Sequence, residues 1–277
     1  MRKLIFPGCV ISARYPQFEA ATKLLLEKLG VEAVSLGGFS CCPEPSSMQL
    51  LDRTSWLVLA ARNLSLAEEA GLDLVSLCSG CTKSLLSAWR ELRSEEKRRE
   101  VNRYLSAVGR SYKGGSRVES ILRLLYEEVG VDRVKAAVEK PVEVRAATHL
   151  GCHIYEELPE YDDIKSPRAL KELVSAAGAE PVSYEGEELC CAYYVWGADR
   201  ELALEQVRLK LSNALDAGAE CMVVVCPTCF RQFELAQIGW SRRLPVLYLS
   251  QLLALAAGVP AEKLGFKYHM VEVKLGE

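Results

Sequence analysis

Ten of the eleven cysteines in this 277-residue chain fall into two sets with matching spacing. Each set contains a lone cysteine, then an adjacent pair, then a Cys-x-x-Cys motif. The first set is Cys9, Cys41, Cys42, Cys78 and Cys81, and the second is Cys152, Cys190, Cys191, Cys226 and Cys229. Corresponding cysteines lie 143 to 149 positions apart. A five-cysteine pattern that recurs this closely indicates an internal duplication, so we expect a fold of two similar halves.

The segments that lead into these cysteines have the pattern of short buried strands. Strands that turn at Gly-Cys are predicted for residues 3–8 and 145–151, and strands that end at Cys-x-x-Cys for residues 72–77 and 221–225. Helical patterns that stop before a glycine lie between them, at residues 18–29, 54–70 and 201–217.

This alternation of strands and helices predicts an α/β fold. We expect two duplicated α/β domains with mainly parallel sheets, related by pseudo-twofold symmetry. The first cysteine-rich domain would span residues 1–140 and the second residues 141–277, with the junction around Pro141. Ligands of parallel sheets gather beyond the carboxyl ends of the strands, which is where the cysteines lie in the sequence.

The first half is longer than the second by about 20 residues, which lie within residues 90–117. This stretch is dense in both charge signs, as in the run from Glu95 to Glu100. Mixed charge of this kind is typical of a solvated helical hairpin, and a docking surface is the alternative.

The overall composition is that of a soluble globular protein, with 49% hydrophobic and 26% charged residues. A formal net charge of -3 gives no reason to expect nucleic acid or a membrane surface as a partner. The apolar run at the N-terminus is too short for a signal peptide, and the stretch 244–260 is too short and interrupted to span a bilayer. We therefore expect a cytoplasmic protein, in which so many cysteines indicate metal binding or redox chemistry rather than disulfides.

The number of cysteines per half narrows the chemistry. Thiolates bind iron–sulfur clusters and soft metals, but a structural zinc site and an ordinary cubane cluster each take four ligands. With five cysteines per half, either one thiol is idle or the cluster is not an ordinary cubane. An adjacent pair such as Cys41 and Cys42 could bind neighbouring irons, with one sulfur bridging them. Zinc and plain buried thiols remain as alternatives.

The residues around the cysteines resemble those of the B-type subunits of heterodisulfide reductase, a family built from two cysteine-rich domains named for a Cys-Cys-Gly core. The resemblance covers nearly the whole chain. It rests on Gly8-Cys9 followed by Arg14-Tyr15-Pro16, Ser40-Cys41-Cys42-Pro43 with Trp56, Cys78-Ser79-Gly80-Cys81, Gly151-Cys152-His153, and Val225-Cys226-Pro227 with Cys229 and Gln232-Phe233.

This resemblance implies a catalytic oxidoreductase subunit in which each five-cysteine set holds a noncubane [4Fe-4S] cluster. A disulfide would be split, or reversibly formed, between the two clusters, each taking one thiolate at an iron. Electrons would arrive from a ferredoxin-like iron–sulfur subunit, itself fed by a flavin subunit. The alternatives are a component of a related sulfur-oxidising complex that acts on another disulfide or on protein-bound sulfur, a non-catalytic electron relay, and a module with zinc in one half.

One segment departs from the family pattern, which places a glycine-rich run after the second Cys-Cys pair. This chain has Ala192-Tyr193-Tyr194-Val195-Trp196-Gly197 there. If the three aromatic rings line the space between the clusters, they would narrow it and alter the choice of substrate. The alternative is that the rings pack in the core.

Three histidines and one cysteine remain outside the two sets. His153 directly follows Cys152 and is the candidate catalytic residue, as a proton donor to a leaving thiolate or a hydrogen-bond donor to cluster sulfur. A loop histidine bonded to the backbone is the alternative. We expect His149 to be structural, assign no role to His269, and expect Cys221 to be a buried inert thiol because it has no counterpart in the first set.

Overall fold

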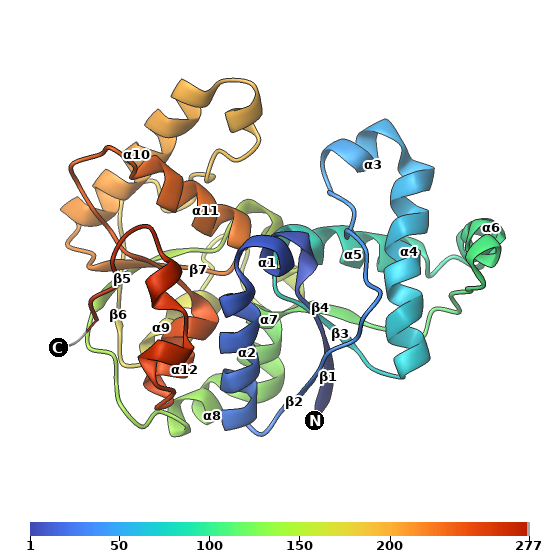
Figure 1. Ribbon diagram of the computed structural model, residues 1–277, viewed down its shortest axis with the longest axis horizontal. Helices are drawn as coiled ribbons and strands as arrows, with labels where there is room; N and C mark the ends of the chain where they lie inside the picture. The colour runs from blue at the N-terminus through green and yellow to red at the C-terminus, as the bar shows by residue number, and fades with distance from the viewer. Residues whose placement is uncertain (276–277) are drawn as a thin grey trace.

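The chain folds into two four-stranded, all-parallel sheets that share one topology, as Figure 1 shows. The computed structural model describes residues 1–275. The first sheet has the order β2 (Glu32–Val34), β1 (Arg2–Phe6), β3 (Leu74–Ser76), β4 (Val118–Ser120). The second has the order β6 (Glu180–Val182), β5 (Arg145–His149), β7 (Cys221–Val224), β8 (Val246–Tyr248). The predicted α/β fold with two similar halves is confirmed.

The register of the central strands is also the same in the two sheets. In the first, Phe6 at the end of β1 pairs with Ser76 at the end of β3. In the second, His149 at the end of β5 pairs with Val224 at the end of β7. Since each of these strand pairs ends just before a cysteine motif, the four motifs emerge at the carboxyl edges of the two sheets.

Helices cover both faces of the first sheet (Figure 1), and the helices predicted over residues 18–29 and 54–70 correspond to α2 (Pro16–Lys28) and α4 (Arg53–Ala70). Helix α4 starts at Asp52, whose carboxylate accepts a 3.0 Å hydrogen bond from the Ser55 N–H, and stops at Gly71 with φ of 64°. A π-helical segment, Leu124–Gly130, separates the last two helices. The helices of this half are α1 (Gly8–Arg14), α2 (Pro16–Lys28), α3 (Ser47–Leu51), α4 (Arg53–Ala70), α5 (Ser79–Glu91), α6 (Glu95–Leu105), α7 (Ile121–Arg123) and α8 (Val131–Ala136).

The second half has fewer long helices and more 3-10 turns. Its α-helices are α9 (Ala169–Ala176), α10 (Arg200–Asp216), α11 (Pro227–Ala236) and α12 (Leu249–Ala256). The 3-10 segments are Cys152–Glu156, Leu158–Glu160, Val195–Gly197, Ala261–Lys263 and Phe266–Tyr268, with Ser106–Val108 in the first half. The Asp199 carboxylate begins α10 by accepting a 3.0 Å hydrogen bond from the Leu202 N–H.

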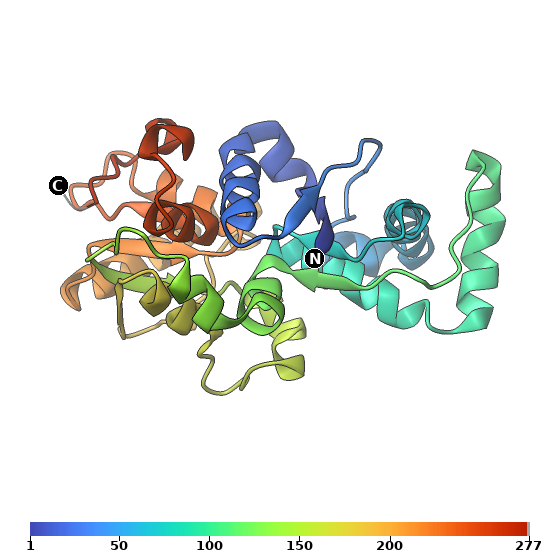
Figure 2. The same cartoon turned by 90° about the horizontal axis from the view of Figure 1, so that it is seen from below.

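The extra residues of the first half form the end of α5, the helix α6 and the return to β4. Helix α6 presents most of its charged residues to solvent but buries Val101 and Leu105. This buried side packs on α4, and α6 lies at the end of the molecule far from the second half (Figures 1 and 2). The predicted charged helix is therefore present, but it packs one side on α4 instead of forming a solvated hairpin.

The two halves pack together through α2 and α12, which lie side by side in both views (Figures 1 and 2). Phe18 of α2 stacks on Tyr248 with ring centroids 4.7 Å apart and meets Phe230 edge-on at 4.8 Å. The Thr22 hydroxyl donates a 2.8 Å hydrogen bond to the Ser250 hydroxyl beside them. This buried aromatic contact fixes the orientation of one half on the other.

The segment between the sheets runs from β4 to β5. The N–H groups of Glu139 and Lys140 both donate to the Ala256 carbonyl, at 2.9 and 3.0 Å, so this segment is packed against the second half. A domain boundary between residues 140 and 141 remains a proposal. None of the helices within residues 1–275 is both long and apolar enough to cross a membrane.

Candidate functional site

Four of the cysteines follow the central strands directly. Cys78 and Cys226 occupy the N-cap positions of α5 and α11, and their Sγ atoms are 3.9 Å apart. Cys9 lies in the first turn of α1, and Cys152 begins a 3-10 helix. The carboxyl edges of the two sheets therefore face each other with sulfur at the point of contact.

The second cysteine of each Cys-x-x-Cys motif lies in the first turn of its helix, close to a glycine of the other motif in its half. A Cβ on Gly8 would come within 2.8 Å of the Cys81 Sγ, and a Cβ on Gly151 within 3.4 Å of the Cys229 Sγ. Both glycines also have φ of +76°. Each Gly-Cys turn thus requires glycine for its backbone conformation and for the approach of sulfur.

Helix α4 and helix α5 hold the loop that carries the first adjacent pair. The Asn63 side chain accepts a 2.9 Å hydrogen bond from the Ser40 N–H and donates one of 2.9 Å to the Cys41 carbonyl. The Ser84 hydroxyl donates to the Cys42 carbonyl at 3.0 Å and accepts from the Trp56 indole N–H at 2.9 Å. These bonds fix the backbone at the two cysteines.

Helix α10 holds the second adjacent pair with different side chains. The Gln206 amide donates a 2.9 Å hydrogen bond to the Cys190 carbonyl. The buried Lys210 ammonium donates to the Glu187 and Leu189 carbonyls at 2.7 and 2.8 Å, which secures the approach to the pair. Ala192, directly after the pair, is buried with φ of +56°, a conformation that costs an L-residue about 1–2 kcal/mol.

All ten cysteines line one cavity of about 130 Å³ between the halves. Cys9, Cys41 and Cys152 are solvent-exposed, so the cavity opens to the surface, while the Cys-x-x-Cys residues lie at its buried end. The structure therefore brings together every residue of the two predicted cysteine sets.

Each set also forms a connected chain of sulfur contacts. Hydrogen bonds from Cys41 and then Cys81 lower the pKa of Cys42, and bonds from Cys152 and then Cys191 lower the pKa of Cys190. One cysteine of each adjacent pair is thus predisposed to be a thiolate, the form that binds metal. The donor set of the first half is sulfur alone, and its five thiols line one cavity, which fits an iron–sulfur cluster better than a four-ligand zinc site.

His153 and two of the three aromatic residues also line the cavity. Burial, followed by the charge of Lys83, lowers the pKa of His153, so its imidazole is mainly neutral near pH 7. Tyr193 and Tyr194 are 39% and 43% exposed and form part of the rim. The Tyr194 hydroxyl donates to the Glu44 carboxylate of the other half and so bridges the mouth of the cavity.

The prediction for Trp196 as a lining residue is wrong. Its ring is half-buried against the core of the second half and lies 4.8 Å from the Arg200 guanidinium, outside the cysteine cavity. Of the three aromatic residues, the two tyrosines line the cavity and the tryptophan packs against the core. Cys221 is fully buried in β7, and burial raises the pKa of its thiol to about 12, as expected of an inert thiol.

Three residues near the site carry no signal in the sequence. Asn63, Gln206 and Lys210 fix the cysteine loops, but they come from helix interiors more than 15 positions away in the chain. His149, expected to be only structural, is buried within 4.8 Å of the Cys191 and Cys229 sulfurs. Its place three positions before Cys152, at the end of a predicted strand, was the available signal.

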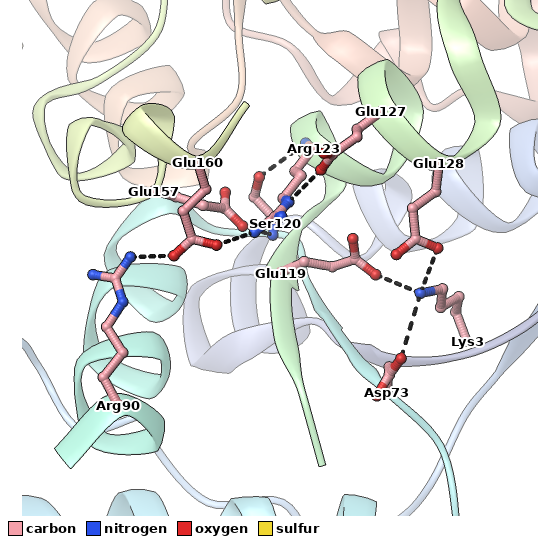
Figure 3. Close-up of polar contacts among 10 residues, drawn as sticks. All are labelled: Lys3, Asp73, Arg90, Glu119, Ser120, Arg123, Glu127, Glu128, Glu157 and Glu160. Atoms are coloured by element: carbon pink, nitrogen blue, oxygen red, sulfur yellow. Dashed lines mark hydrogen bonds and ion pairs between the residues drawn. The ribbon is translucent and has the colours of Figure 1, made fainter. Parts of the chain in front are cut away.

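A network of charged side chains joins the halves beside the cavity. Figure 3 shows Arg90 of α5 and Arg123 of α7 meeting on Glu160 of the second half. Arg90 also bonds to Glu156 at 2.9 Å, and Arg123 to Glu127 at 2.7 Å. Burial acts to raise the pKa of Glu160, but the hydrogen bonds from Arg90 and Arg123 prevail and lower it.

Three further contacts in Figure 3 involve β4, the edge strand of the first sheet, or the side chain of Lys3 beside it. The Glu157 carboxylate accepts a 2.9 Å hydrogen bond from the Ser120 N–H at the end of β4. The buried Lys3 ammonium pairs with Glu119 at 2.6 Å and with Glu128 at 2.7 Å. Because Cys78 precedes α5 and Cys152 begins the 3-10 helix, the ion pairs of Arg90 and Arg123 with Glu160 link the segments that carry the two cysteine sets.

Comparison with known proteins identifies the family. The model of the CCG cysteine-rich domain matches residues 4–85 and 146–234, one copy in each half and more than half of the chain. A ferredoxin/F420H2-dependent CoB-CoM heterodisulfide reductase B-type subunit of Methanosarcina acetivorans is 37% identical over 284 residues, covering 98% of this chain and 95% of the relative. The chain belongs to the B family of heterodisulfide reductase subunits. The resemblance seen in the sequence is thereby confirmed.

Other relatives show how the family varies. A heterodisulfide reductase B-like protein of Archaeoglobus profundus is 33% identical, covering 94% of this chain and 91% of the relative. A protein named 8-methylmenaquinol:fumarate reductase membrane anchor subunit, of Wolinella succinogenes, is 32% identical with 98% of both chains covered. The crystal structure of a hypothetical protein from Helicobacter pylori matches with a TM-score of 0.77 at 17% identity, covering 99% of this chain and 52% of that one, and shares the fold.

Proposed function

We propose that this heterodisulfide reductase B-family chain is the disulfide-cleaving iron–sulfur component of a multisubunit complex. Its ten cysteines, five in each half, would hold two noncubane [4Fe-4S] clusters, one in each half. The observation that carries the proposal is the convergence of both sets on one cavity, where Cys78 and Cys226 approach to 3.9 Å. Two sulfur-rich sites that face each other across an open cavity suit a substrate that is divided between them.

The proposed reaction converts a disulfide, two electrons and two protons into two thiols. Bound in this cavity, the clusters would supply the electrons and an open iron for each thiolate. The S–S bond breaks, and each sulfur gains one electron and one proton. His153 lies at the cavity wall, and its neutral imidazole is the proposed hydrogen-bond donor to a leaving sulfur. The exposed mouth at Cys9, Cys41 and Cys152 gives the substrate access.

The electrons would come from a ferredoxin-like iron–sulfur subunit, itself reduced by a flavin subunit. Support comes from the relatives, which are named as subunits of heterodisulfide reductases, including a D-type subunit of Methanosarcina acetivorans of which this chain covers 59%. Such cysteines require a compartment in which thiols remain reduced, so we place the complex in the cytoplasm.

The substrate proposed here is a disulfide with small or apolar groups at its sulfur atoms. The B-type relatives from Methanosarcina are named for the CoB-CoM heterodisulfide. In this chain the rings of Tyr193 and Tyr194 and the bridge from Tyr194 to Glu44 narrow the rim of the cavity. A narrow rim with a carboxylate favours small groups over bulky, strongly anionic ones.

Metal analysis with absorption and EPR spectroscopy of anaerobically purified protein tests the proposal. We expect about eight irons per chain and the brown colour of an iron–sulfur protein. Replacing Cys41 with alanine should remove or convert the first cluster and leave the second, because each half supplies its own ligands. The matched variant Cys190→Ala should do the reverse, and both should lose turnover of a disulfide. Colourless protein with stoichiometric zinc would contradict the proposal.

A zinc site in the second half is the alternative, and one observation favours it. A ring nitrogen of His149 and the sulfurs of Cys191 and Cys229 all lie within 4.8 Å of one another, which is a mixed nitrogen and sulfur set of the kind zinc accepts. About four irons and one zinc per chain, with the zinc lost in Cys191→Ala, would establish this alternative.

A further inference from the structure

His149 makes the two otherwise duplicated sites chemically different. His149 and Phe6 occupy equivalent positions in the two sheets. Each is the last residue of the first strand of its half, and each pairs with a residue that lies two positions before a Cys-x-x-Cys motif. Both side chains are buried, at 3% and 1% exposure. The first site therefore has a phenyl ring where the second has an imidazole.

The imidazole faces the cysteines of the second set. One of its ring nitrogens lies within 4.8 Å of the Cys191 and Cys229 sulfurs. The ring packs edge-on against Phe233, with centroids 4.9 Å apart, which holds it in this orientation. In the first half, Gly8 lies beside both the Phe6 ring and the Cys81 sulfur. A Cβ placed on Gly8 would be 3.8 Å from the Phe6 ring and 2.8 Å from the Cys81 Sγ.

Both ring nitrogens of His149 are buried and have no hydrogen-bond partner among residues 1–275. Buried polar groups of this kind are rare, because each unmade bond costs about 1–3 kcal/mol. The ring also borders a cavity of about 500 Å³ whose charged lining groups, Lys165, Lys171, Glu187 and Glu188, make no hydrogen bond to it. The Cys191 and Cys229 sulfurs are the groups of the cysteine site that lie close enough to become hydrogen-bond partners of the ring.

A buried imidazole beside thiolates is a hydrogen-bond donor. An imidazole carries at least one N–H in either protonation state, so the ring can donate a hydrogen bond to a nearby sulfur. Hydrogen bonds to cluster sulfur stabilise the more negative, reduced state and raise the reduction potential.

We infer that His149 donates a hydrogen bond to the Cys191 or Cys229 thiolate and makes the second cluster easier to reduce than the first. This inference rests on the two clusters of the proposed function. Phe6 cannot donate such a bond, so the chain would use one fold to build two sites of unequal potential. Electrons would then reside preferentially at the second site.

Potentiometric titration of the anaerobically purified full-length chain, followed by EPR and absorption, tests this inference. His149→Phe copies the residue of the first half and should leave the iron content unchanged. We expect it to lower the midpoint potential of one cluster and to leave that of the other in place. His149→Gln retains an N–H donor of similar reach and should restore part of the shift. The reciprocal variant Phe6→His should raise the potential of the other cluster.

Phe233→Leu is the matched control for packing. It removes the aromatic neighbour of the ring but keeps the N–H donor, so it should lower the melting temperature and shift the midpoint potential by less than His149→Phe does. Unchanged midpoint potentials in His149→Phe would overturn the inference, and so would equal shifts in His149→Phe and His149→Gln. If the iron content were still about eight per chain, the proposed function would stand in either case. Iron loss from the second site in both His149 variants would also overturn it. Absence of iron from the parent chain would refute the proposed function itself, and the inference with it.

Discussion

Glu234 is a buried carboxyl group on α11, the helix that carries Cys229 and begins at Cys226. One of its oxygens accepts a hydrogen bond from the Met270 N–H and so ties the C-terminal segment to α11. The other oxygen has no partner within residues 1–275. Burial dominates over the bond from Met270 and raises the pKa of Glu234 from 4.5 to about 7.

This shift makes the stability of the protein depend on pH. A carboxyl group whose pKa is higher in the folded state stabilises the fold fully below its unfolded pKa, and this stabilisation is lost as pH rises through the folded pKa. For Glu234 the window runs from pH 4.5 to about 7. At about 1.4 kcal/mol for each pH unit, the loss between these limits is about 3 kcal/mol.

The substitution Glu234→Gln removes the ionisation and retains an oxygen that can accept from the Met270 N–H. We expect the parent and the variant to have the same free energy of unfolding near pH 5, to within about 1 kcal/mol. Near pH 8 the variant should be more stable by about 3 kcal/mol. Urea unfolding of both proteins at pH 5, 6, 7 and 8 measures the difference, in which contributions of other groups cancel.

Glu205→Gln is the matched control, because Glu205 is exposed on α10. The control should follow the parent at every pH. A difference between Glu234→Gln and the parent that does not change with pH would refute the reasoning, since it would show that Glu234 ionises alike in the folded and unfolded chain.

Three further substitutions test the site. Ala192→Gly should raise the free energy of unfolding by up to about 1 kcal/mol, because glycine adopts φ of +56° without strain; a lower urea midpoint would contradict this. Tyr193→Gly with Tyr194→Gly should leave the iron content unchanged and raise the rate with a bulky disulfide relative to a small one. A fall in stability with unchanged selectivity would instead show that the two rings serve packing. Cys221→Ala should alter neither iron content nor turnover, and iron loss would show that Cys221 is a ligand.

Local sequence patterns determined most of the fold and the composition of the site. The five-cysteine spacing predicted the duplication, and the apolar segments before each motif predicted β1, β3, β5 and β7. Such patterns are readable because strand and helix periodicity reflect burial along one element. Caps such as Asp52 and turns such as Gly71 are likewise local, so the bounds of α4 follow from nearby residues.

Only the tertiary structure decided how the two cysteine sets meet and what surrounds them. The 3.9 Å approach of Cys78 to Cys226 depends on α2 packing on α12 and on Arg90 and Arg123 meeting at Glu160. Those contacts join residues far apart in the chain, whose spacing carries no periodic signal.

The aromatic run and His149 show the same limit. Tyr193 and Tyr194 line the cavity, while Trp196 turns away from it and packs against the core beside Arg200, because a 3-10 turn changes the direction of the chain there. His149 reads as an ordinary strand residue until sheet pairing places it beside Cys191 and Cys229. Sequence specifies the donors, and the packing of one half on the other decides which space they share.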